Sequence, residues 1–180
     1  VDEAVQIRTT VINSTSNAQN YSGNATVGSS SDLVIIKVQA WDASALEDPA
    51  NWTVTLGGGS ALTASTKNFD TAIDFAVAVY EVTSPPTGTP AVAVDLGGAG
   101  RACQALVWVI SGHDTGTPVA GRGVATSYSS DVATRAFTRT TTRDNNVLVS
   151  MLGVRETVTT SEFSLSGGTL ISAAKSQRID

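Results

Sequence analysis

Apolar residues recur at every second position along most of the chain, and Gly, Pro, Asn or Asp interrupts each run after about five to ten residues. A period of two is the repeat of a β-strand, whose successive side chains point to opposite faces of a sheet. The pattern predicts strands at residues 5–11, 32–41, 52–56, 61–67, 73–83, 91–96, 102–111, 123–128, 134–141, 146–154, 163–165 and 169–174. We therefore expect an all-β fold, an antiparallel β-sandwich of jelly-roll or Ig-like type with about ten to twelve strands.

Two of these segments, 33–38 and 105–110, are almost continuously apolar, which is typical of central strands packed on both faces or against a partner chain. The polar stretch 13–22 is predicted to be an exposed loop. One short helix is expected at residues 43–48, where Pro49 would end it.

Clusters of Gly, Pro and Asn predict the turns between strands, at residues 57–59, 85–88, 97–100, 144–146 and 167–168. The glycine-rich segment 95–101 superficially resembles a phosphate-binding loop. Such loops open a helix, whereas a strand pattern follows at Ala102, so a hairpin turn is expected there.

Composition favours one domain, residues 1–180, because it hardly changes along the chain and no Pro/Gly/Ser linker divides it. Residues 1–13 are expected to be an extended arm that can add a strand to a neighbour's sheet edge. The net charge of −5 argues against nucleic acid as a partner, since its binding needs clustered Lys and Arg. No apolar run approaches the roughly 18 residues of a membrane span, so no membrane partner is expected.

The single histidine lies in the sequence Ser111-Gly112-His113-Asp114, which places a hydroxyl, an imidazole and a carboxylate close together. A serine hydrolase needs a strained turn that presents the nucleophile, and no Gly-x-Ser-x-Gly motif is present. The segment is therefore interpreted as a turn that begins at Asp114. The single cysteine, Cys103, has apolar neighbours and is expected to be buried.

A pair of carboxylates about 5 to 10 Å apart would suit glycoside hydrolysis. The candidates are Glu47, Asp48, Asp70, Asp74, Glu81 and Asp95, for which solvated strand positions are the favoured interpretation. One His and one Cys do not build a zinc site, and the calcium candidates 68–70 and 143–146 lack a recognised loop pattern. We expect no catalytic, cofactor-binding or metal-binding residues, and hence a protein that is not an enzyme.

Four aromatic side chains lie near predicted loops, where they would stack on sugar rings: Trp41, Trp52, Tyr21 and Tyr128. Trp108, between Val107 and Val109, is expected to be packed. The N-glycosylation pattern occurs at Asn13, Asn20, Asn24 and Asn51. The aromatic residues motivate an alternative function, a secreted adhesin or carbohydrate-binding module with glycans as ligands.

Five landmarks follow one another along the chain: Asp32-Leu-Val-Ile-Ile-Lys-Val38, Trp52-Thr-Val-Thr-Leu-Gly-Gly58, and the segments 78–88, 106–119 and 143–149. In this order they resemble the β-sandwich domain of tailed-phage virion proteins, of the capsid decoration or fibre type, and of related secreted bacterial surface proteins. The polar stretch 13–31 departs from the resemblance.

The resemblance implies a non-enzymatic structural protein, located in a virion or outside the cell, whose partners are copies of itself and other virion or surface-assembly proteins. Sparse charge and abundant Ser, Thr and Ala agree with this expectation, because such surfaces lose their water at low cost in repeated subunit contacts.

Overall fold

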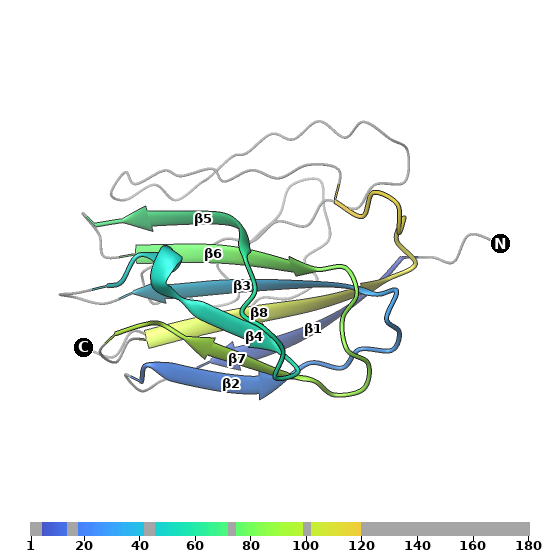
Figure 1. Ribbon diagram of the computed structural model, residues 1–180, viewed down its shortest axis with the longest axis horizontal. Coiled ribbons are helices and arrows are strands. Elements are labelled where there is room, and N and C mark those ends of the chain that lie inside the picture. Colours follow the sequence, from blue (N-terminus) through green and yellow to red (C-terminus); the bar gives the residue numbers. More distant parts are fainter. Residues whose placement is uncertain (1–4, 14–17, 42–45, 72–74, 99–101, 120–180) are drawn as a thin grey trace, which may run out of the picture.

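The computed structural model describes residues 5–13, 18–41, 46–71, 75–98 and 102–119, which form strands and one 3-10 turn. Five strands form an antiparallel sheet in the order β1-β8-β3-β6-β5: β1 (Gln6–Asn13), β3 (Leu33–Trp41), β5 (Ala64–Asp70), β6 (Phe75–Val82) and β8 (Ala102–Ser111). Three more form a second antiparallel sheet in the order β2-β7-β4: β2 (Asn20–Asn24), β4 (Thr53–Leu56) and β7 (Ala91–Asp95). Figure 1 shows the three-stranded sheet in front of the five-stranded one. The predicted all-β, antiparallel class is confirmed.

A single hydrophobic core joins the two sheets. On β3 the alternate residues Val34, Ile36 and Val38 are fully buried in it, and on β7 the residues Val92 and Val94 meet them from the other sheet. On each of these strands, the intervening residues point away from the core, as the period of two predicts. The same alternation places Cys103 in the core, where burial raises the pKa of its thiol to about 12.

The central strands β3 and β8 are buried on both faces. A second apolar cluster, Leu33, Trp108 and Ile110, lies on the side of the five-stranded sheet that faces away from the three-stranded one. This finding confirms the prediction from the apolar runs 33–38 and 105–110.

Several connections carry the chain from one sheet to the other. Among the described strands, the chain changes sheet between every consecutive pair except β5 and β6. The hairpin expected at residues 95–101 is therefore wrong, because β7 and β8 belong to different sheets. Gly97 still supplies the predicted positive φ, with a value of 74°, at the start of this crossing.

The predicted loop at 13–22 is wrong in part, because β2 begins at Asn20 and pairs with β7 along its length. Its outward side chains are polar and its inward contribution is Tyr21, so the run lacks an apolar alternation. The expected arm is also corrected: Gln6 to Asn13 is β1, which pairs with β8 of the same chain.

The expected helix at 43–48 is not found in its described part, residues 46–48. Instead, a 3-10 turn (Pro49–Asn51) begins at the proline, whose missing N–H suits a first helical position. Asp48 caps this turn by accepting a hydrogen bond from Ala50 N at 2.7 Å. The strands predicted from residue 123 onward lie outside the described residues. Within the described residues, no helix has the length and hydropathy of a membrane span.

Candidate functional site

The segment Ser111-Gly112-His113-Asp114, weighed above as a hydrolase motif, lies at the end of β8 and in the turn that follows it. His113 Nδ1 lies 3.2 Å from the carbonyl oxygen of Ile110. Asp114 accepts hydrogen bonds from Gly116 N at 2.9 Å and from Thr117 Oγ1 at 3.1 Å, which closes a turn. The turn interpretation of this segment therefore agrees with the geometry.

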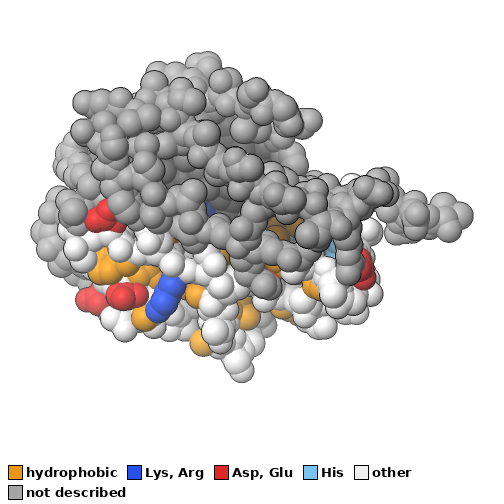
Figure 2. Space-filling view, turned by 90° about the horizontal axis from the view of Figure 1, so that it is seen from above, with side chains coloured by type: hydrophobic (Ala, Val, Ile, Leu, Met, Phe, Trp, Pro, Cys, Tyr) orange, Lys and Arg blue, Asp and Glu red, His pale blue; other side chains and the backbone are white. Residues whose placement is uncertain are grey.

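The candidate carboxylates are distributed over different elements. Glu47 and Asp48 precede the 3-10 turn, Asp95 ends β7, and Asp70 and Glu81 lie on β5 and β6. Asp74 lies outside the described residues. In the face seen in Figure 2, acidic side chains occur in separate places. Within the described ranges, no three His, Cys, Asp or Glu side chains gather in a way that suits a metal ion. The calcium candidate 143–146 lies outside those ranges.

The aromatic residues expected to stack on sugars are core residues. Trp41, Trp52 and Tyr21 expose only 3%, 6% and 8% of their surface. The Tyr21 hydroxyl accepts a hydrogen bond from Ala18 N at 3.1 Å. These three rings are therefore not a sugar platform, and Tyr128 lies outside the described residues. Trp108 is buried, as predicted.

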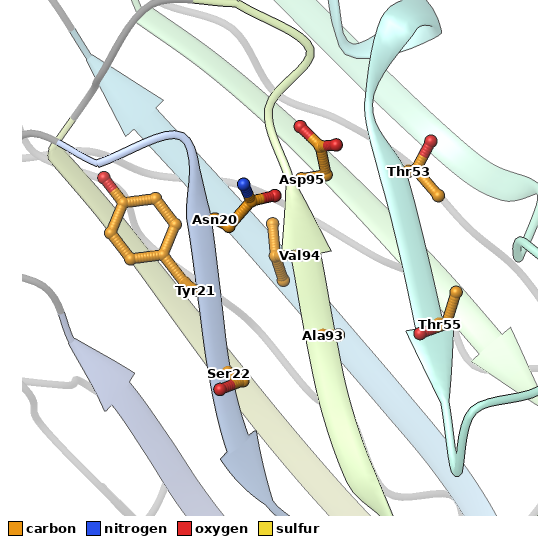
Figure 3. Close-up of a pocket in the computed structure, with 8 residues that line it drawn as sticks. All are labelled: Asn20, Tyr21, Ser22, Thr53, Thr55, Ala93, Val94 and Asp95. Atoms are coloured by element: carbon orange, nitrogen blue, oxygen red, sulfur yellow. The ribbon is translucent and has the colours of Figure 1, made fainter.

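A shallow hollow lies on the outer face of the three-stranded sheet (Figure 3) and has a volume of about 220 Å³. The register across β2, β7 and β4 arranges its side chains in two rows. The first row is Asn20, Asp95 and Thr53, and the second is Ser22, Ala93 and Thr55. Adjacent rows are about 7 Å apart along the strands and neighbours in a row are about 4.8 Å apart.

Asp95 is the charged residue of this hollow, and its side chain is held in place. Its Oδ1 accepts hydrogen bonds from Gln19 Nε2 and from Gly97 N, both at 2.8 Å. Both bonds use the same oxygen, and among the described residues no hydrogen bond to Oδ2 occurs, so Oδ2 can accept one from a ligand. Ala93 is the smallest side chain in the hollow and leaves its centre open.

Three buried polar side chains form a hydrogen-bonded row on the five-stranded sheet, and the sequence reasoning missed this row. Lys37 Nζ donates a hydrogen bond to Gln39 Oε1, and Gln39 Nε2 donates to Gln104 Oε1 at 2.9 Å. All three side chains are buried, and burial lowers the pKa of Lys37 to about 7. The only sequence signal was one lysine inside the apolar run 33–38.

Comparison with known proteins gives no match: no family model, no curated protein and no solved structure is similar to this chain.

Proposed function

We propose that the chain is a β-sandwich domain of jelly-roll or Ig-like type, with about ten to twelve strands, and that it is a non-enzymatic structural protein of a virion. A capsid decoration protein or a head-fibre or tail-fibre subunit is the form we favour. Its partners are copies of itself and other virion or surface-assembly proteins, and its place is in the virion or outside the cell.

The observation that carries the proposal is a group of three uncharged loop segments at one end of the molecule. Three segments, 29–31, 57–61 and 83–89, are exposed except at Pro85, and they contain Gly, Ser, Thr, Pro and Ala but no charged residue. We call these segments the loop end. Figure 1 shows the connections after β2, β4 and β6 leaving the sheets on the same side. Uncharged groups of this kind lose their water at lower cost than ions do, which favours protein contacts.

Local contacts hold these segments together. Val27 N donates to Gly88 O and Gly88 N donates to Val27 O, both at 2.9 Å. A methyl group on Gly57 would lie 2.8 Å from Pro86 Cγ, so the two loops are in close contact. A preformed surface loses less conformational entropy when a partner binds.

The order of the sequence landmarks also supports the proposal. The first four fall on β3, β4, the end of β6 with its following turn, and the end of β8. The fifth, 143–149, lies outside the described residues.

Size-exclusion chromatography with light scattering, at rising concentration, tests the assembly. We expect oligomers, or binding to particles from the native source, that Ser60→Glu and Thr87→Glu weaken. Thr71→Glu is the matched control, because Thr71 is exposed at the opposite end of β5. A chain that stays monomeric at every concentration and binds no particle contradicts the proposal.

A secreted adhesin or carbohydrate-binding module is the second candidate. The buried tryptophans do not support it, but the hollow on the three-stranded sheet does, since it combines hydrogen-bonding side chains with an open centre.

A further inference from the structure

The two rows of the hollow contain hydrogen-bond donors and acceptors that are mostly neutral. Asn20 supplies an amide, Thr53, Ser22 and Thr55 supply hydroxyl groups, and Asp95 supplies a carboxylate. Apart from this carboxylate, the side chains are uncharged. A ligand with many neutral hydroxyl groups matches this set, because each hydroxyl both donates and accepts.

The centre of the hollow differs chemically from its borders. Ala93 presents a methyl group between Ser22 and Thr55, its partners across the sheet. In Figure 3 it lies below the row that contains Asp95 and between the flanking strands. A sugar ring has the matching arrangement, with C–H groups on its face and hydroxyl groups around its edge.

Charge narrows the ligand class further. The single carboxylate disfavours anionic ligands through like-charge repulsion, and one carboxylate is too few for a tight divalent-cation site. Gln19 and Gly97 hold the Asp95 side chain in position before any ligand arrives. The Asp95 carboxylate is therefore a fixed, charged acceptor for one or two sugar hydroxyl groups. Such an acceptor forms stronger hydrogen bonds than a neutral one.

We propose that this hollow binds one neutral pyranose residue of a glycan, with Ala93 under the ring and Asp95 accepting hydrogen bonds from its hydroxyl groups. The inference gives a site to the second candidate function and does not depend on assembly through the loop end. Tyr21 is the aromatic residue among those that line the hollow, and it is packed in the hydrophobic core, so it offers no exposed ring for stacking. The affinity of a single site is therefore weak, in the range of about 1 mM. Several copies in one assembly would strengthen attachment through multivalency.

The test is an NMR titration of the full chain, labelled with nitrogen-15, with the neutral methyl glycosides of glucose, galactose and mannose. We expect at least one of them to cause saturable shifts in the amide signals of Ser22, Ala93 and Thr55. Glucuronate, which carries a negative charge, should bind about tenfold more weakly than the best neutral sugar.

Two variants locate the site. Ala93→Gln fills the hollow and should abolish the shifts, whereas Ala91→Gln, one row along the same exposed face of β7, should leave them unchanged. Asp95→Asn keeps Oδ1 as an acceptor for Gln19 and Gly97 but removes the charge, and should weaken binding about tenfold.

Three results would overturn the inference: no saturable shift with any of the neutral glycosides, equal binding by the Ala93→Gln variant, or tighter binding of glucuronate. The amide spectrum shows in the same experiment that each variant is folded. None of these results bears on the light-scattering test, so the two proposals fail separately.

Discussion

Gln39 on β3 lies directly opposite Gln104 on β8, and its side-chain amide donates a hydrogen bond to the Gln104 carbonyl oxygen at 2.9 Å. Both side chains are buried, and Gln39 accepts a hydrogen bond from Lys37 in turn. The row therefore connects two central strands through polar groups that have lost contact with water. Groups in such an environment make stability sensitive to pH when one of them titrates.

Lys37 provides the first prediction. Its pKa is lowered from 10.5 to about 7 by burial, so between these values the unfolded chain holds a proton that the folded chain has released. Stability should therefore rise as pH increases from about 7 toward 10, by at most about 1.4 kcal/mol per pH unit, and the full penalty of burying the charge applies below pH 7.

Urea unfolding at a series of pH values measures this slope. The Lys37→Met variant should lose the rise in that pH range, whatever its absolute stability. An identical slope in the variant would show that another group causes the pH dependence.

Gly23 provides the second prediction, because β2 passes close to β1 at this residue. A methyl group on Gly23 would lie 2.6 Å from Ile12 Cγ1. Gly23→Ala should destabilise the fold by about 1–3 kcal/mol through overpacking. In a double-mutant cycle, Ile12→Ala should remove part of this cost, since the two changes act on the same contact. Strict additivity of the two changes would contradict the proposed contact.

Two glycines with similar φ values allow the cost of backbone strain to be distinguished from the cost of a steric clash. Gly58 and Gly97 have φ values of 71° and 74°, but an added methyl group meets nothing within 4 Å at Gly58 and lies 2.8 Å from the Asn51 carbonyl oxygen at Gly97. Gly58→Ala should cost about 1 kcal/mol, the penalty of the left-handed conformation. Gly97→Ala should cost clearly more, because the backbone of Asn51 must move. Thermal unfolding of both variants compares them, and equal melting temperatures would refute the difference.

Tyr80 provides a prediction in which a substitution does not destabilise the fold. Its ring is packed in the core, burial raises the pKa of its hydroxyl to about 12, and that hydroxyl has no hydrogen-bond partner among the described residues. Tyr80→Phe should therefore change stability by anything from zero to a gain of about 1 kcal/mol. Tyr80→Ala, which removes the ring, should cost about 3–5 kcal/mol. A loss of more than about 1 kcal/mol in Tyr80→Phe would indicate that the hydroxyl has a partner after all.

The sequence predicted β3 and β8 well because their apolar runs report burial on both faces directly. It did not reveal β2, whose outward residues are polar and whose core residue Tyr21 resembles a loop aromatic when seen alone. Periodicity says which side chains share a face, but it does not say which strands are neighbours. The assignment of a hairpin after β7 was wrong for this reason, since a glycine cluster serves a crossing between sheets as well as a tight turn.

The hollow was beyond sequence reasoning for a related reason. Its first row joins Asn20, Asp95 and Thr53, which come from three separate parts of the chain and meet only through the strand register. Asp95 was recognised as a candidate carboxylate, but its neighbours follow from the order β2-β7-β4, which no local pattern encodes.

The position of β8 between β1 and β3 also governs how the chain is assembled as it is synthesised. Gln6 pairs with Ser111, and Leu33 pairs with Ile110, so both partners of β8 leave the ribosome long before it does. Until then β1 lacks the one strand with which it pairs among the described residues, and β3 lacks one of its two neighbours in the sheet. Such distant pairings slow folding and lengthen the time during which strand edges are exposed. Slow translation before residue 102 should therefore harm the folding of this chain more than that of a chain with local pairings.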